Sequence, residues 1–360
     1  MHKVTQLLLI ILLSCGQRLN AQTVYLDVSK GDDRNAGTAL APVASFDKAI
    51  SLTGNFSGKD SIVIKVQPGL YVLRDKITLD KQVSENLWLT IEAAVMPDDP
   101  DWKPEKMPVI QSVSENNSQT QFPHAVGFLI AANRVRIQGL KFVGNTNPEI
   151  RYYYPVTREN ETLNGLEVSQ CYFIGERNSS PIQGAIWAHG AGTHVDHCIF
   201  YGAKNALLLF KSIKDFSLTN SIIYGAYEAA VWFGPFTSDF KFSNNIVSNC
   251  TYFWLREENT FPKYTFRNSL FTDMKGFMGY YSKSGSIPAN KNEHTEIDVR
   301  RSGNLILSAV ETNGLPRDYL NPASESDGRE LNAGIFKSKI KERKVHEIFN
   351  QNLPDNISKP

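Results

Sequence analysis

Polar residues that recur at a nearly constant spacing constrain this chain more than any other feature. Between residues 135 and 275, a short apolar segment is repeatedly followed by one polar residue, a small residue and two apolar ones. Aligning these segments gives one polar column, whose members lie 23 to 32 residues apart: Gln138, Gln170, His197, Asn220, Asn244 and Asn268. A period in this range indicates stacked supersecondary units, each of which packs only on its neighbours.

The segments between the polar positions are short and rich in Val, Ile, Phe and Tyr, which favours strands over helices. Short strands at this period fit a coil in which each turn lays its strands parallel to those of the turn below. A tight turn between two strands needs a residue that tolerates the left-handed conformation and whose side chain can bond to backbone and to the next coil. Asn meets this need best, so the column predicts an all-β, single-stranded parallel β-helix.

Three further motifs carry a resemblance to a known family. The segment 25–38, with Pro42, Phe46 and Ala49 after it, is similar to the opening of the pectate-lyase-like superfamily of right-handed parallel β-helices. Pro68-Gly69-Leu70-Tyr71 resembles the start of its first full turns, and residues 321–334 resemble its closing strand. The resemblance covers about residues 23–337 and implies a right-handed solenoid with a short N-terminal capping helix at 44–53. The family includes exported carbohydrate-active proteins of bacteria, but a shared fold does not imply a shared activity.

The chain begins with the pattern of an export signal. Lys3 precedes an apolar run at 7–13 that is too short to span a bilayer, and Ala21 ends a small-residue cleavage site. We therefore predict a signal peptide at 1–21, a β-helix domain at 22–340 and a charged tail at 341–360, in a secreted or periplasmic protein. The alternative is a lipobox at 12–15, which would lipidate Cys15 and give an outer-membrane lipoprotein. No later segment is apolar enough for a membrane span.

The balance of charges argues against nucleic acid as a partner. Without residues 1–21 the chain has 36 basic and 37 acidic residues, so it offers no global field for nucleic acid. We expect a monomer with a polysaccharide substrate.

Cys171, Cys198 and Cys250 are an odd number of thiols, and the first two hold matching repeat positions. We interpret them as stacked, buried thiols that serve as small apolar side chains.

One strand of each coil is expected to present its outer face to a polysaccharide. Alternation along these strands places Ile186, Leu207, Val231, Phe253 and Phe277 inward. The neighbouring outward column then contains Trp187, Trp232 and Trp254, which would form an exposed apolar strip unless a ligand or loop covers it. The loop at 144–164 adds Tyr153 and Arg151, and we predict these five residues to bind substrate.

A polysaccharide lyase that acts on a uronic-acid glycan is the favoured function. β-Elimination needs a group that neutralises the carboxylate, a base and an acid. Arg256 suits the first role, His189 or Lys283 the second and Tyr280 the third. His189 and Tyr280 would lie almost 20 Å apart at about 4.8 Å per coil, so Arg256 and Tyr280 with a loop residue form the tighter set.

Two other functions stay open. A glycoside hydrolase would need two carboxylates about 5–9.5 Å apart, for which Glu228 with Glu257 or Glu258 are the candidates. A non-catalytic glycan-binding protein would keep the tryptophan strip alone. We predict no cofactor and no metal: the acidic clusters of calcium-dependent pectate lyases and the spacings of Cys/His metal sites do not occur. His197 belongs to the polar column, which indicates a structural role.

Overall fold

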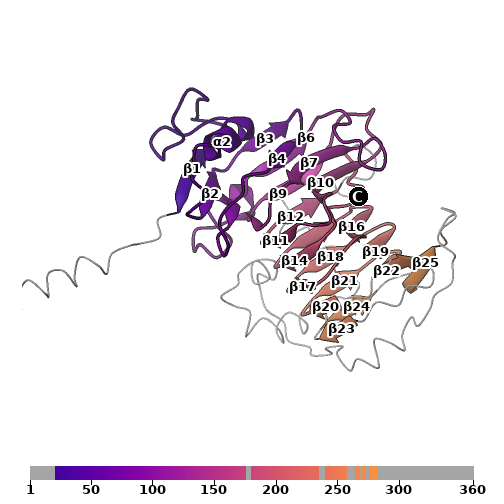
Figure 1. Cartoon of the computed structure of the whole chain (residues 1–360). Coiled ribbons are helices and arrows are strands. Elements are labelled where there is room, and N and C mark those ends of the chain that lie inside the picture. Colours follow the sequence, from indigo (N-terminus) through magenta and orange to yellow (C-terminus); the bar gives the residue numbers. More distant parts are fainter. Residues whose placement is uncertain are drawn as a thin grey trace, which may run out of the picture.

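The computed structural model describes residues 21–175, 180–234, 240–257, 264–267, 269–272 and 276–281. The expected signal peptide, the closing strand at 321–334, the charged tail, Lys283 and Asn268 lie outside these residues. The described strands form three parallel sheets, and each coil adds one strand to each sheet in turn. Figure 1 shows these coils stacked along one axis from β1 to β25. The chain is therefore a right-handed parallel β-helix, as the sequence predicts.

The three sheets are named here in the order in which each coil visits them. Sheet A contains β1 (Gln22–Leu26), β2 (Ile62–Val66), β5 (Leu89–Ala93), β8 (Val135–Gln138), β11 (Asn164–Ser169), β14 (Ala191–Asp196), β17 (Phe216–Thr219), β20 (Phe240–Ser243) and β23 (Tyr264–Arg267). Sheet B contains β3 (Leu70–Leu73), β6 (Val109–Ser112), β9 (Lys141–Asn145), β12 (Tyr172–Ile174), β15 (Ile199–Tyr201), β18 (Ile222–Tyr224), β21 (Ile246–Ser248) and β24 (Leu270–Thr272). Sheet C contains β4 (Ile77–Leu79), β7 (Ala125–Ile130), β10 (Tyr153–Arg158), β13 (Ile186–Ala188), β16 (Asn205–Leu209), β19 (Ala229–Phe233), β22 (Tyr252–Glu257) and β25 (Gly276–Tyr281).

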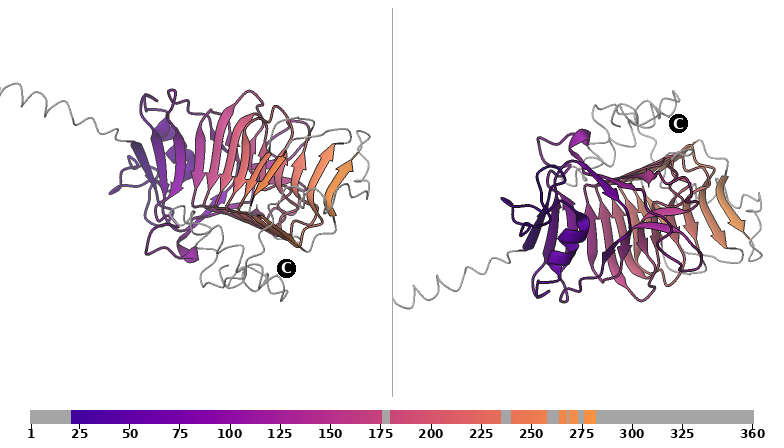
Figure 2. Two further views of the ribbon diagram at one scale, coloured as in Figure 1. Left: turned by 90° about the horizontal axis from the view of Figure 1, so that it is seen from below. Right: turned by 90° about the horizontal axis from the view of Figure 1, so that it is seen from above.

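A short helix covers the N-terminal end of the stack, as Figure 2 shows. This helix, α2 (Phe46–Thr53), begins at Ser45, whose hydroxyl accepts a hydrogen bond from the Lys48 amide at 3.2 Å. Such an N-cap satisfies one of the amides that the first helical turn leaves without a partner. Phe46 then packs edge-on against Tyr71 and Phe128, with ring centroids 5.3 and 5.2 Å apart. The helix thus closes the open end of the core, which confirms the predicted cap.

The core repeats the same contacts from coil to coil. In sheet B the inward side chains Phe142, Phe173 and Phe200 stack with centroids 5.0 Å apart and nearly parallel planes. Parallel, in-register strands place equivalent residues about 4.8 Å apart, so identical aromatic side chains can stack along the axis. Cys171 and Cys198 are free, buried thiols at equivalent positions beside this stack, which agrees with their predicted apolar role.

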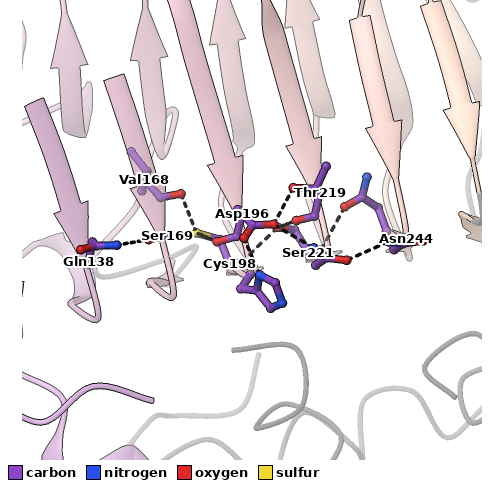
Figure 3. A network of polar contacts seen from close by, with 11 residues as sticks. Gln138, Val168, Ser169, Asp196, Cys198, Thr219, Ser221 and Asn244 are labelled. Atoms are coloured by element: carbon purple, nitrogen blue, oxygen red, sulfur yellow. Dashed lines mark hydrogen bonds and ion pairs between the residues drawn. The ribbon is translucent and has the colours of Figure 1, made fainter. Parts of the chain in front are cut away.

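The polar column lies at the tight turn between sheets A and B (Figure 3). Gln170, His197, Asn220 and Asn244 all have positive φ angles, between 49° and 59°, as this turn requires. Gln138 was aligned one residue too early. It pairs with Ser169 at the end of the strand, and Gly139, with φ of 69°, occupies the turn position. Glycine reaches this conformation without a Cβ clash, so no polar side chain is needed there.

Bonding between coils also uses neighbouring positions that the sequence pattern did not reveal. Asn244 donates to Asn220, but Asn220 donates to Asp196 and not to His197. In the next position of the turn, the side chains of Ser221 and Asn245 accept hydrogen bonds from the amides of Cys198 and Ser221 in the coil before. The carboxylate of Asp196 therefore replaces the histidine as the acceptor between coils.

Stability is expected to depend on pH through Asp196. Burial raises the pKa of this carboxyl. Hydrogen bonds from His197, Thr219 and Asn220, together with the charge of His197, lower the pKa by more, so that it lies below its ordinary value. Its contribution is therefore complete above the unfolded pKa near 4 and is lost as the pH falls through the lower folded pKa. Asp196→Asn should cost about 1 kcal/mol at pH 7 and nothing at acid pH, as measured by urea unfolding. An equal loss at both pH values would contradict this.

Candidate functional site

The outer face of sheet C carries an aromatic cluster that is separate from the core. It consists of the buried Tyr154, Trp187 and Leu208 with the half-buried Phe122, Tyr152, Phe210 and Trp232. Trp187 and Trp232 lie in the same outward column because both pair with Leu208 in register. Phe210 packs edge-on against Trp232 at 5.8 Å. The cluster therefore extends over several consecutive coils, as predicted for two of the three tryptophans.

The third tryptophan faces the other way. Trp254 pairs with Val231, not with Trp232, and its side chain is 1% exposed within the main core. The register that the sequence predicts, with Trp254 beside Trp232, is therefore wrong by one residue. Leu255 takes the outward position next to Trp232 instead. The predicted inward orientation of Ile186, Leu207, Val231 and Phe253 is correct, since all four belong to the core cluster.

The same shift moves the predicted carboxylate-neutralising residue off the face. Arg256 pairs with Phe233, a core residue, and is only 4% exposed. Tyr280 is the partner of Arg256 in β25. The residue that follows Arg256, the half-buried Glu257, occupies the outward register. Tyr153 was also predicted to bind substrate, but it is 1% exposed and lies in the core because the start of β10 turns its side chain inward.

His189 does lie on the predicted outer face, beside Trp187 at a centroid distance of 5.7 Å. Its Nδ1 accepts the amide proton of Lys211 at 3.1 Å, which leaves the ring proton on Nε2. The Gln121 amide lies 3.5 Å from Nε2 and can accept this proton only when its oxygen is turned toward the ring. Burial first, and then the charge of Lys211, lower the pKa of His189 to about 4. The ring is therefore neutral at pH 7 and presents a donor, an arrangement that does not suit a general base.

A loop at residues 113–124 folds back over this face and was not foreseen. Phe122 stacks on Trp187 with ring planes 12° apart and centroids 6.1 Å apart. His124, which is fully buried, directs Nδ1 to the Phe122 carbonyl at 2.8 Å and Nε2 to the Glu159 carboxylate at 3.2 Å. Both ring nitrogens thus face oxygen atoms, one on the loop itself and one on β10's neighbour Glu159. The loop is held to sheet C by an ion pair.

Glu159 is the centre of this attachment. It also accepts hydrogen bonds from Ser118 at 2.6 Å and Thr120 at 2.7 Å, both in the loop. Burial raises the pKa of Glu159, but the hydrogen bonds from His124, Ser118 and Thr120 outweigh it and lower the pKa to about 2. A sequence signal for this pair was absent, because His124 and Glu159 lie 35 residues apart in different coils.

Polar groups border the cluster at both ends of the strands. At the end where the strands begin, Glu228 accepts a hydrogen bond from Asn205 at 2.8 Å and pairs with Lys204 at 3.3 Å. At the same end, Arg151 is exposed just before β10 and lies over the ring of Tyr152 at 5.1 Å. At the other end, beyond β13, His189 accepts the Lys211 amide. An apolar surface between polar edges is the usual composition of a small-molecule or sugar site.

The predicted pair of hydrolase carboxylates is not brought together. Glu228 precedes Ala229, which pairs with Tyr252, whereas Glu257 lies five residues beyond Tyr252 along β22. At about 3.3 Å per residue the two carboxylates are separated by more than about 16 Å along the strand. Glycoside hydrolysis needs about 5–9.5 Å. The other candidate, Glu258, lies outside the described residues.

In the described part of the chain no three His, Cys, Asp or Glu side chains gather as a metal site would require. No helix there is long and apolar enough to cross a membrane.

Comparison with known proteins finds similarity only among solved structures. No family model matches the chain, and no curated protein matches it. A lacto-N-biosidase from Eubacterium ramulus is 10% identical, with a TM-score of 0.48 over 71% of this chain and 57% of that chain. A pectate lyase is 15% identical, with a TM-score of 0.42 over 71% and 78%, and a rhamnogalacturonan lyase is 13% identical, with a TM-score of 0.37 over 75% and 65%. At these identities and TM-scores none of the three is a basis for function, which is inferred from the chain's own residues.

Proposed function

We propose that this protein is an exported, carbohydrate-active β-helix protein that binds a glycan chain along the outer face of sheet C. The observation that carries the proposal is the aromatic strip formed by Phe210 and Trp232, both half-buried, next to the covered Trp187. A half-buried aromatic strip is costly in water unless a ligand covers it, and the apolar faces of sugar rings stack on such side chains. Export rests on the signal predicted at residues 1–21.

The polar borders of the strip suit the hydroxyl groups and charges of a glycan. Where the strands begin, Glu228 offers acceptor oxygens and Lys204 offers a donor, with side chains 22% and 29% exposed. Arg151 and Lys211 add positive charge near the strip, which favours a glycan that carries carboxylates. The ligand class that fits these groups best is a uronic-acid polysaccharide.

Cleavage of that glycan by β-elimination is the second candidate function. It is favoured by the position of Lys211, whose positive charge acts on the ring of His189 at one end of the strip. A cation there can neutralise a uronate carboxylate, which is the first requirement of a lyase. Arg256, which the sequence predicted for that role, is 4% exposed. Tyr280 stays the proposed acid, and Lys283, a predicted base, lies outside the described residues.

A panel of acidic and neutral polysaccharides separates these functions. We expect retardation of the protein in affinity gels that contain a uronic-acid polysaccharide. A lyase would also release products with the ultraviolet absorbance of unsaturated uronic-acid ends, whereas a hydrolase would release reducing ends without that absorbance. A protein that is retarded by no polysaccharide of the panel and cleaves none would contradict the proposed function.

Arg151→Gln should weaken binding of an acidic glycan about threefold to tenfold and make the affinity less sensitive to salt. The reason is that Arg151 is an exposed cation beside the strip, held over Tyr152. The matched control is Arg136→Gln, since Arg136 lies over Trp88 on the outer face of sheet A. Affinity at two salt concentrations is the measurement. Equal effects of both changes would show that the location of the charge does not matter.

A further inference from the structure

A cavity of about 460 Å³ lies at the corner where two neighbouring coils pass from sheet B to sheet C. One wall is the turn between β3 and β4, and the other is the segment that leads from β6 into the 113–124 loop. The lining is mostly polar and includes Arg74, Asp75, Lys76, Glu115, Asn116 and Asn117. Pockets that hold small ligands in proteins measure about 300–1,000 Å³, so this cavity is large enough for one sugar unit.

Hydrogen bonds to backbone hold the two walls together. The Lys76 ammonium donates to the carbonyl of Asn117, and the Asp75 carboxylate accepts the amide of Lys76 at 2.7 Å. The Asn117 side chain is fixed in turn to β7, since it accepts the Val126 amide at 2.8 Å and donates to the Val126 carbonyl at 3.1 Å. The cavity therefore exists before any ligand binds, which lowers the entropic cost of binding.

Three side chains of the cavity have binding groups to spare. Arg74, Glu115 and Asn116 are exposed, and within the described ranges of the chain none of them has a hydrogen-bond or ion-pair partner. A guanidinium binds a carboxylate through two parallel hydrogen bonds. A carboxylate accepts hydrogen bonds from hydroxyl groups, and an amide both accepts and donates them. A sugar ring that carries one carboxylate and several hydroxyls uses all three side chains.

The cavity lies in line with the polar border of the glycan site. Lys76 directly precedes β4, just as Arg151 lies shortly before β10 and Lys204 directly precedes β16. Sheet C runs from β4 through β7 to β10 and on to β19, as Figure 1 shows. At about 4.8 Å per coil, β4 is about 10 Å from β10 and about 24 Å from β19, which carries Trp232. A glycan that follows the axis from Trp232 past Arg151 therefore reaches the cavity.

We propose that this cavity is a subsite for one uronic-acid unit, with Arg74 on its carboxylate and with Glu115 and Asn116 on its hydroxyl groups. The subsite rests on the proposed function, because its ligand is a unit of the same glycan. It extends the glycan site beyond the aromatic strip to the N-terminal coils, and it gives the protein a preference for long acidic chains.

Galacturonate tests the subsite without the polymer. The side-chain Nε–H signal of Arg74 in a nitrogen-15 NMR spectrum is assigned by its loss in Arg74→Gln. We expect millimolar galacturonate to shift this signal and galactose to leave it in place. Acetate should need about tenfold higher concentration, because it lacks the hydroxyl groups that Glu115 and Asn116 bind. A signal that does not respond to galacturonate, or responds equally to acetate, would overturn the subsite.

An oligosaccharide of uronic acids longer than about 24 Å tests the connection to the strip. Arg74→Gln should weaken its binding about threefold to tenfold. The matched control is Arg34→Gln, whose native side chain is 90% exposed and pairs with Asp32 near β1. This change should alter the affinity less than about twofold. Equal effects of the two changes on a protein that binds the oligosaccharide would contradict the subsite.

The two proposals fail in different ways. A protein that binds the oligosaccharide while galacturonate leaves the Arg74 signal unchanged keeps the proposed function and loses the subsite. A protein that binds no polysaccharide, but whose Arg74 signal responds to galacturonate as expected, loses the proposed function, and the cavity is then supported as a site for the sugar acid itself.

Discussion

Replacing Glu159 by glutamine is expected to lower the free energy of unfolding by about 3 kcal/mol and to release the 113–124 loop from sheet C. The carboxylate is only 15% exposed and pairs with a fully buried His124. Glutamine keeps the shape but removes the charge, which leaves the histidine ring without its counter-ion. The loop should then detach, and Trp187 should lose the stacking of Phe122. Urea unfolding and tryptophan fluorescence measure the two effects.

The stabilisation that Glu159 provides depends on pH in a definite direction. The folded pKa of Glu159 is about 2, below the ordinary value of 4.5. Its stabilisation is therefore complete above about pH 4.5 and disappears as the pH falls toward 2. Glu159→Gln should abolish that part of the pH dependence. The control is Glu161→Gln, because Glu161 is exposed and accepts a bond from Ser212 only on the surface. If both variants lose the same stability, the ion pair does not hold the loop.

Arg158→Met should be about equally destabilising, for a different reason. The guanidinium is fully buried at the C-terminal end of β10, where burial lowers its pKa to about 10. It donates to the carbonyls of His189 and Ala191, at 2.5 and 2.9 Å, and to the Thr193 hydroxyl at 2.7 Å. Methionine fills much of the space but leaves these buried acceptors without donors. We expect a loss of about 3 kcal/mol in urea unfolding.

The control for this change is Arg136→Met. Arg136 lies on the outer face of sheet A, where it pairs with Glu167 at 2.6 Å and both side chains are partly exposed. Such pairs contribute at most about 1 kcal/mol. Since Arg158 also holds the backbone of His189, its replacement should weaken glycan binding as well. A stable Arg158→Met protein with unchanged binding would mean that the turn between sheets C and A is fixed by other contacts.

The fold was predictable because it depends on periodicity, and periodicity tolerates small errors. One polar residue per coil was enough to predict stacked strands, although Gln138 was assigned to the turn position that Gly139 occupies. The orientation of side chains on the outer face was harder to predict, because a shift of one residue exchanges the inward and outward positions of a strand. That shift placed Trp254 and Arg256 on the wrong side, whereas Trp187 and His189 were placed correctly.

The polar part of the site could not be predicted for another reason. His124 and Glu159 meet only because the 113–124 loop folds back over sheet C, and Gln121 reaches His189 through the same loop. Loop conformation follows from tertiary contacts and leaves no periodic trace in the sequence. The aromatic strip was therefore predictable from alternation, while its cover and its buried ion pair were not.

Glycan affinity of two matched tryptophan variants tests the central claim most directly. Trp232 and Trp88 are both half-buried, but Trp232 lies in the aromatic strip of sheet C and Trp88 lies under Arg136 on sheet A. We predict that Trp232→Ala weakens binding of the uronic-acid polysaccharide about tenfold or more, whereas Trp88→Ala changes it less than about twofold. Unchanged affinity of folded Trp232→Ala, or an equal loss in Trp88→Ala, would show that the glycan does not bind on the outer face of sheet C.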